Sequence, residues 1–193
     1  MSETRPSGGG QRILLIGSPG SGKSVLAEQL SHRLGLPLVR MDDLYWREGW
    51  TRSPEGTFLA ELEEAVRRER WIIDGHHQPS LGVRLDRADT IVLLDLPPAV
   101  CLFRVLVRGL RRQLGATRDL PRRVRDEPRG RRGSLDLAFV RKVLSFRRVV
   151  RPGLLRTLEP LRTSKRILIL RKRGSTHQLT ETVLAALRDG LTA

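Results

Sequence analysis

The feature that most constrains the fold of this chain is a glycine-rich run, GSPGSGKS, at positions 17–24. It matches the pattern G-x-x-x-x-G-K-[ST], which joins a buried strand to the first turn of a helix in phosphate-binding proteins. An apolar run, Ile13–Ile16, leads into the glycines, and Leu26, Leu30 and Leu34 follow them at four-residue spacing. A chance turn could supply glycine and serine, but both flanks and the Lys-Ser pair favour a phosphate loop.

The loop residues have distinct roles in that chemistry. Glycines let backbone N–H groups converge on phosphate oxygens, and the helix N-terminus adds a favourable dipole. We expect Lys23 to reach the β- and γ-phosphates of ATP, and the Ser24 hydroxyl to ligate Mg²⁺. ATP and Mg²⁺ are therefore the predicted cofactors. The predicted nucleotide-binding residues in this segment are Gly17, Ser18, Pro19, Gly20, Ser21, Gly22, Lys23, Ser24 and Val25.

Short apolar runs alternate with amphipathic stretches from Arg12 onward, which predicts an α/β fold with a parallel sheet covered by helices. The predicted strands are Ile13–Ile16, Leu38–Met41, Trp71–Ile73, Ile91–Leu94 and Ile167–Leu170. Lys23–Leu34 is predicted to be a helix that ends at Gly35. A second helix opens at Ser53-Pro54, with Phe58, Leu59, Leu62 and Val66 on one side, and Ser175 and Gln178 have capping-box spacing ahead of a last helix. We expect a flexible leader at 1–10 and one domain at 11–193.

Composition narrows the possible partners. No apolar run approaches bilayer length, so we expect no membrane partner, and the lone Cys101 fits a cytoplasmic protein. The net charge is +15, and all but four of the 36 basic residues are arginine. Arginine suits phosphate, so phosphorylated small molecules and nucleic acid are both candidate partners. Alternatively, most of these arginines cover solvent-facing surfaces and bind no phosphate.

Three predicted strands end in aspartate, at Asp42-Asp43, Asp74 and Asp95. The carboxyl ends of parallel strands face the ligand crevice, so each could hold Mg²⁺ or accept a proton, although turn or capping roles are alternatives. We prefer Asp74 as the acid on the Mg²⁺ side and Asp42 as the base on the acceptor side. Asp95 precedes Leu96-Pro97-Pro98, where a turn residue is expected.

The pair His76-His77 follows Asp74-Gly75. Adjacent side chains in an extended loop point apart, so we expect no two-histidine metal site; either a contact with the acceptor or a plain loop role remains open. Cys101 lies in an apolar helix pattern and is predicted to be inert packing.

Residues 99–114 are predicted to form a helix with Phe103, Leu106, Val107, Leu110 and Leu114 in one stripe. Arg104, Arg108, Arg111 and Arg112 lie opposite this stripe. The following stretch, 115–134, carries seven arginines and little apolar periodicity. Either a lid that closes over ATP or a solvated loop fits that composition. A further helix after Ser134 would carry Arg147 and Arg148 at its end, followed by Arg151-Pro152.

Several strings together resemble one family. GSPGSGKS, Met41-Asp42-Asp43-Leu44-Tyr45-Trp46 with Gly49-Trp50, and Trp71–Gly75 are similar to the bacterial topology-modulation proteins of the FlaR type, which are adenylate-kinase-like P-loop proteins. The likeness covers nearly the whole chain beyond the leader. Two departures leave the acceptor open: His76-His77 replaces the Asn-Tyr that is common in the family, and the Asp-Gly-Phe-Pro-Arg string of true adenylate kinases is absent.

The resemblance implies a three-layer P-loop NTPase fold of the nucleoside and nucleotide kinase type, with a five-stranded parallel sheet of order 2-3-1-4-5. It implies an acceptor-binding segment at about 42–70, a lid at about 112–134, and an adenine-side loop after Leu170 that includes Arg171. The catalytic residues predicted from the motif, the strand ends and the resemblance are Lys23, Asp42, Asp74, Arg104, Arg108, Arg148 and Arg151, with Ser24 and Asp74 on the metal.

Two functions remain from the sequence. The first is an ATP-dependent phosphotransferase acting on an unidentified small molecule. The alternative is an NTP-binding, nucleic-acid-associated protein that influences DNA topology, which only bulk charge supports because no aromatic platform or recognition helix is evident. We favour the kinase, since Asp42 and Asp74 have no role in coating DNA. The acceptor and the oligomeric state are not specified by the sequence.

Overall fold

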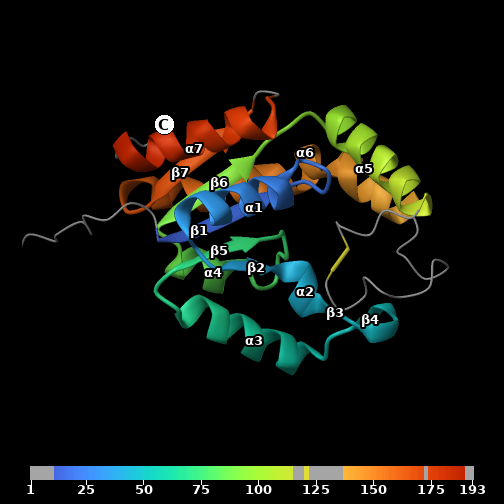
Figure 1. The fold of residues 1–193 in the computed structure, drawn as a ribbon, viewed down its shortest axis with the longest axis horizontal. Coiled ribbons are helices and arrows are strands. Elements are labelled where there is room, and N and C mark those ends of the chain that lie inside the picture. The colour runs from blue at the N-terminus through green and yellow to red at the C-terminus, as the bar shows by residue number, and fades with distance from the viewer. Residues whose placement is uncertain (1–10, 115–119, 122–136, 172–173, 190–193) are drawn as a thin grey trace, which may run out of the picture.

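The computed structural model describes residues 11–114, 120–121, 137–171 and 174–189 (Figure 1). The predicted leader and most of the predicted lid lie outside these residues.

A five-stranded parallel sheet forms the middle layer (Figure 1). Its strands are β1 (Arg12–Gly17), β2 (Leu38–Arg40), β5 (Trp71–Asp74), β6 (Thr90–Leu94) and β7 (Arg166–Leu170). Their order across the sheet is β2-β5-β1-β6-β7. Counted along the chain, this is 2-3-1-4-5, which confirms the predicted order. The three inner strands, β5, β1 and β6, are mostly apolar and buried because helices cover both faces of the sheet.

Alternate residues of β1 point into two separate cores. Ile13 and Leu15 pack with α1 (Lys23–Leu34) and α7 (Thr176–Asp189), whereas Leu14 and Ile16 pack with the helices of the other face. Those helices are α3 (Glu55–Arg67), α4 (Leu81–Arg87) and α6 (Leu137–Leu158). The predicted three-layer α/β fold is therefore confirmed, and the period of two in β1 explains how one strand serves both layers.

Local signals set several boundaries as predicted. Helix α1 ends at Gly35, which is left-handed at φ 62° and whose N–H donates to the Ser31 carbonyl. Ser175 and Gln178 form the predicted reciprocal cap before α7, with hydrogen bonds of 2.9 and 3.2 Å. Between β2 and α3 lie α2 (Met41–Tyr45), a turn of 3-10 helix (Glu48–Trp50), and a two-stranded hairpin of β3 (Trp46–Arg47) and β4 (Thr51–Arg52).

Three details differ from the sequence predictions. Met41 begins α2 and is not part of the strand. Leu59 is 37% exposed, while Phe58, Leu62 and Val66 of the same helix are buried. Helix α6 does not end near Arg151-Pro152 but continues through Pro152 to Leu158. Phe146 and Leu154, on either side of the proline, are both buried, so tertiary packing offsets the missing hydrogen bond of proline.

Helix α5 (Pro98–Gln113) forms as predicted, but four of the five residues of its predicted apolar stripe face solvent, and Val107 is half-buried. Phe103, Leu106, Leu110 and Leu114 are 47–78% exposed, while Cys101 and Val105 on the opposite side are buried. An apolar stripe normally faces the core, and here the side with Arg104, Arg108 and Arg112 takes that place, while Arg111 is exposed. The reason lies in the site described below.

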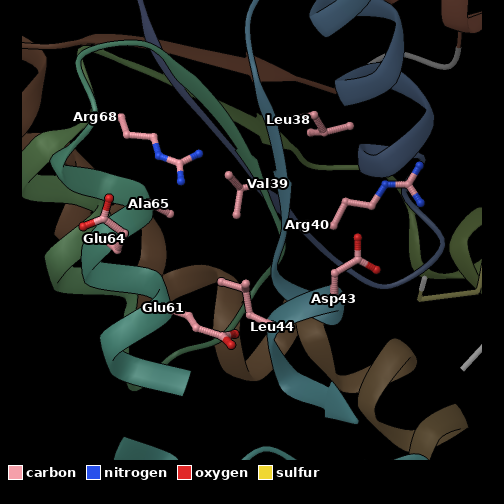
Figure 2. A pocket seen from close by; sticks show the side chains of 9 residues that line it. All are labelled: Leu38, Val39, Arg40, Asp43, Leu44, Glu61, Glu64, Ala65 and Arg68. Carbon is pink, nitrogen blue, oxygen red and sulfur yellow. The ribbon is translucent and has the colours of Figure 1, made fainter. Parts of the chain in front are cut away.

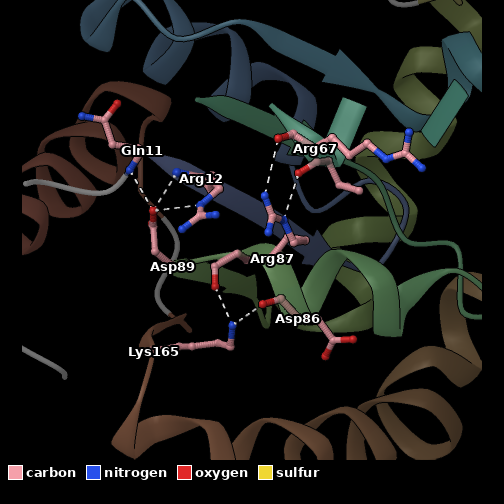
Figure 3. A network of polar contacts seen from close by, with 9 residues as sticks. Gln11, Arg12, Arg67, Asp86, Arg87, Asp89 and Lys165 are labelled. Atoms are coloured by element: carbon pink, nitrogen blue, oxygen red, sulfur yellow. Dashed lines mark hydrogen bonds and ion pairs between the residues drawn. The ribbon is translucent and has the colours of Figure 1, made fainter. Parts of the chain in front are cut away.

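The amino ends of the strands are fastened by a polar cluster (Figure 3). The Asp89 carboxylate accepts hydrogen bonds from the backbone N–H groups of Gln11 and Arg12 at 3.0 and 2.9 Å. The Lys165 ammonium donates to the carbonyls of Asp86 and Ala88, both at 2.8 Å, and so satisfies the end of α4. This end of the sheet is structural, which leaves the carboxyl ends of the strands for chemistry.

Candidate functional site

The glycine loop folds between β1 and α1 as predicted, and it packs against α5. Gly20 has a left-handed φ of 79°, and a Cβ placed there would lie 2.3 Å from the Cys101 carbonyl oxygen. Only glycine allows this approach. The contact confirms Cys101 as a buried packing residue, and burial raises the pKa of its thiol.

The loop presents its backbone to an anion. Gly22 caps α1 without a side-chain hydrogen bond, so the first N–H groups of the helix stay available to a phosphate. The Lys23 ammonium donates to the Ser18 carbonyl at 2.9 Å and so lies across the loop. From α5, the Arg104 guanidinium donates to the Ser21 carbonyl at 3.1 Å. This contact explains why the arginine-bearing side of α5 faces inward.

Asp74, Ser24 and Lys23 come together in front of α1. Asp74 is the last residue of β5 and is 5% exposed. Burial raises the pKa of Asp74, and the Lys23 charge and the Ser24 hydroxyl oppose this shift. Burial also lowers the pKa of Lys23, opposed by Asp74 and Asp42, while Arg108 lowers it further. The predicted residues Asp42, Asp74 and Arg108 therefore all act electrostatically on Lys23.

The residues at this point fit a magnesium ion. Asp74 Oδ1 is buried and has no hydrogen-bond partner among the described residues. Such an atom is costly unless a ligand satisfies it, and a carboxylate oxygen beside a serine hydroxyl suits Mg²⁺, whose remaining ligands are usually phosphates and water. No cluster of three or more His, Cys, Asp and Glu with metal-binding geometry occurs in the described part of the chain. A nucleotide-dependent magnesium site does not need one.

Asp42 reaches the site from α2, which packs closely on the loop after Asp74. Gly75 has φ 141°, and a Cβ there would lie 2.6 Å from Met41 Cβ. This contact fixes α2 against β5, so that exposed Asp42 lies on the side of Lys23 and Asp74. Its neighbours Asp43 and Leu44 instead line a cavity of about 320 Å³ between β2 and α3 (Figure 2). No residue of the glycine loop lines that cavity, so it is separate from the phosphate site.

Arg84 holds the loop after Asp74 and was missed by sequence reasoning. It is fully buried, and its guanidinium donates to the carbonyls of Gly75, His77 and Ser80 at 2.7, 2.6 and 3.1 Å. Burial lowers its pKa to about 10, so it stays charged at neutral pH. A signal did exist in the sequence: Arg84 shares a helix face with Leu81 and Leu85 and therefore occupies a core position.

The two histidines point apart, as predicted. The His76 ring packs 5.4 Å from the Phe146 ring, and its Nδ1 is buried without a hydrogen-bond partner in the described residues. Burial lowers the pKa of His76 to about 4, helped by Lys23 and Arg84, so the ring is neutral at pH 7. His77 lies 4.9 Å from the Phe58 ring and bonds Ser80 Oγ at 3.0 Å through Nδ1.

Three aromatic side chains, which we call the aromatic wall, lie side by side on α2 and the hairpin segment: Tyr45, Trp46 and Trp50. Tyr45 lies 5.1 Å from Trp46, and Trp46 lies 5.4 Å from Trp50, measured between ring centroids. Trp50 adopts a left-handed φ of 56°, the only positive φ at a described residue other than glycine. Such strain gathers where function fixes a side chain. The Trp50 Nε1 is buried without a hydrogen-bond partner in the described region.

Two further predicted arginines converge on Asp95, which is 6% exposed. The Arg151 Nε lies 2.8 Å from the Asp95 carboxylate, and the Arg171 Nε lies 3.7 Å from it. Asp95 is therefore an anchor for α6 and for the residue after β7, in addition to following β6 at the predicted turn. Arg148 is exposed on α6, and Val25 is 50% exposed in the first turn of α1.

Comparisons with known proteins match the segment that carries the glycine loop, and they match the fold. A family model described as "ATPase family associated with various cellular activities (AAA)" matches residues 13–74, from β1 to Asp74. Adenylate kinases of Synechococcus sp. (strain WH7803) and Moorella thermoacetica are 28% and 27% identical over 131 and 135 residues. Those matches cover 51% and 55% of this chain. The chain spans 55–69% of the length of the curated relatives it matches.

Solved structures share the fold across nearly the whole chain. A gluconokinase from Sinorhizobium meliloti 1021 aligns with a TM-score of 0.54 at 16% identity, covering 93% of this chain and 92% of that one. Shikimate kinase from Acinetobacter baumannii, in complex with shikimate, aligns with a TM-score of 0.55 at 18% identity, covering 95% and 96%. The chain thus has the P-loop kinase fold, and its sequence is adenylate-kinase-like at low identity. None of the described helices is both long and apolar enough to cross a membrane.

Proposed function

We propose that this chain is an Mg²⁺-dependent kinase that transfers the γ-phosphoryl group of ATP to a small molecule. One observation carries the proposal: the buried, unpartnered Oδ1 of Asp74 lies with Ser24 and Lys23 at the mouth of the glycine loop. This is the arrangement that Mg²⁺-ATP requires, and it has no role in a purely structural loop.

Each residue of the site has a proposed role in phosphoryl transfer. Loop amides and Lys23 would bind the phosphates, Ser24 and Asp74 would hold Mg²⁺, and Arg104 would stabilise the negative charge that spreads during transfer. Mg²⁺ would neutralise charge on the β- and γ-phosphates. The acceptor oxygen would form the new bond to phosphorus as the bond to the β-phosphate oxygen breaks, leaving ADP. Asp42 would take the acceptor proton.

The acceptor site we propose lies between Asp42 and the aromatic wall. Neutral His76 and the Trp50 Nε1 each offer a buried polar atom that lacks a partner in the described region, and both could hydrogen-bond an acceptor. Arg108, close to Lys23, would add charge on the phosphate side. We propose that Arg151 and Arg171 hold α6 and the end of β7 in place through Asp95, and that Arg171 lies near the adenine. Arg148 and Val25, both exposed, complete the proposed site residues.

The test is incubation of the protein with γ-labelled ATP and a panel of shikimate, sugar acids, nucleosides and nucleoside monophosphates. We expect one class to gain the label, and Asp42→Asn to abolish transfer while calorimetry shows unchanged Mg²⁺-ATP binding. Ser24→Ala should instead weaken Mg²⁺-ATP binding. Normal turnover by Asp42→Asn with the labelled acceptor would remove the base assignment, and no binding of Mg²⁺-ATP at millimolar concentration would remove the whole proposal.

We propose as a second function that the net charge of +15 serves nucleic-acid binding, and bulk charge is what supports this alternative. A mobility shift with duplex DNA that weakens steeply with salt is its expected result. The inward direction of Arg104 reduces the charge left for DNA on α5. No retention of DNA at low salt would rule this proposal out.

A further inference from the structure

The α5 outer face, which we define as Phe103, Leu106, Leu110 and Leu114, is a continuous apolar surface along one helix. These residues are 67%, 47%, 58% and 78% exposed. Their spacing of three, four and four residues places them on a single stripe. Scattered apolar side chains on a surface need no explanation, but a row of four large ones does.

The phosphate site explains which side of α5 is buried, but it does not explain why the exposed side is apolar. Arg104 must face inward to reach the Ser21 carbonyl, and the backbone of Cys101 must lie against Gly20. Those contacts determine which side of α5 is buried. They place no demand on the outer side, where polar residues would serve a water-facing helix better. The apolar outer side therefore needs a separate function.

Charge and area together indicate the occupant. Phe103 and the three leucines expose together on the order of 400 Å², taking about 200 Å² for a whole phenylalanine side chain and about 150 Å² for a leucine. A stable dimer needs about 800 Å² per partner, and each copy here carries a net charge of +15. Self-association through these four side chains alone would bring two strongly cationic chains together over about half of that area.

A lipid surface avoids both the repulsion between like charges and the limit on contact area, because its anionic headgroups attract a cationic protein. An amphipathic helix with phenylalanine and leucine on one face and arginine beside it lies in the headgroup region of anionic bilayers. Arg111 is exposed next to the stripe, and the neighbouring helix α6 exposes Leu137 and Leu144 together with Arg141 and Arg148. Positive charge of this kind is attracted to phosphatidylglycerol or phosphatidylserine within a Debye length.

We infer that the α5 outer face docks this protein on anionic membrane surfaces, with the helix lying in the plane of the headgroups and the phosphate site on the side away from the lipid. This revises the expectation that no membrane is a partner, which rested on the lack of a spanning segment. The docking is independent of the proposed kinase activity, because none of the four residues faces the glycine loop.

The test is co-sedimentation of the full chain with vesicles of phosphatidylcholine alone, or with roughly one-third phosphatidylglycerol. We expect binding to the anionic vesicles and at least about tenfold weaker partitioning to the neutral ones. The double variant Phe103→Glu/Leu110→Glu should lose at least about tenfold in partitioning to the anionic vesicles. Leu59→Glu/Val83→Glu, at two exposed apolar positions of α3 and α4, makes the same change in charge and should bind as wild type. Melting curves verify that both variants fold.

Three results would overturn the inference. The first is no binding of wild type to the anionic vesicles. The second is equal loss of binding in both double variants, which would show that vesicle binding depends on net charge alone. The third is a dimer, seen by analytical ultracentrifugation, that Phe103→Glu/Leu110→Glu dissociates while vesicle binding is unaffected. In that case the α5 outer face would join two copies of the chain.

Discussion

Replacing Arg84 by methionine should destabilise the protein more than any surface substitution, although Arg84 has no acidic partner in the hydrogen bonds described above. Methionine keeps much of the side-chain volume and removes the guanidinium. The carbonyls of Gly75, His77 and Ser80 would then lose their donor inside the protein. Because these carbonyls belong to the segment after Asp74, the loss would loosen the position of Asp74 as well.

The magnitude follows from the three hydrogen bonds. Each is charge-assisted, and the loss of a donor to a buried acceptor costs about 1–3 kcal/mol. Removal of a buried charge returns part of this, because burying the guanidinium was itself unfavourable. We therefore expect a net loss of about 3 kcal/mol in the free energy of unfolding, or about 6–12 °C in Tm for a chain of this size.

The assay is guanidinium denaturation followed by circular dichroism, with Mg²⁺-ATP titration of the folded variant. Arg84→Lys should recover little, because an ammonium cannot span the three carbonyls. Arg67→Met is the matched control: Arg67 is 73% exposed and pairs with Glu63 at 3.6 Å, so its loss should cost less than about 0.5 kcal/mol. An Arg84→Met stability within about 1 kcal/mol of wild type would refute the reasoning, since those carbonyls would then have other donors.

Three other changes are informative. Gly20→Ala should weaken Mg²⁺-ATP binding at least about tenfold in calorimetry, because its Cβ would meet the Cys101 carbonyl; Gly56→Ala, where a Cβ has open space, should bind normally, and equal affinities would contradict the contact. The pKa of His76 is lowered to about 4, so between pH 6.5 and 4 the unfolded chain binds a proton that the folded chain does not, and stability falls as pH drops through that window. Wild type should lose about 3 kcal/mol more than His76→Phe from pH 7 to 4 in denaturant titrations, and parallel pH profiles would oppose this. Asp95→Asn should cost about 2–4 kcal/mol by thermal denaturation, since it leaves Arg151 without its carboxylate, and an unchanged Tm would show that water replaces the contact.

The backbone of the phosphate site could be predicted from the sequence because its signals are local. The glycine pattern, the apolar run before it and the four-residue leucine spacing after it each constrain neighbouring residues, and all three agree with β1, the loop and α1. The strand order needed the family resemblance, because no local signal says which strands are neighbours.

The orientation of α5 was beyond such reasoning. An apolar stripe and an arginine stripe fit the pattern equally well in either direction, and the usual rule places the apolar one inside. What decides the matter is a tertiary contact, Arg104 with the Ser21 carbonyl, between residues far apart in the chain. The same holds for Asp95, whose partners Arg151 and Arg171 come from α6 and from the end of β7.

The cluster of Asp89, Arg12 and Lys165 has a consequence for how such a chain can change over time. It fastens the amino ends of the strands, a whole strand length from the loop that binds phosphate. Residues that make polar contacts at the amino ends of the strands can be substituted during adaptation to a warmer or colder habitat. The phosphate site at the carboxyl ends of the strands keeps its geometry meanwhile. Thermal adaptation and choice of substrate can then proceed on separate sets of positions.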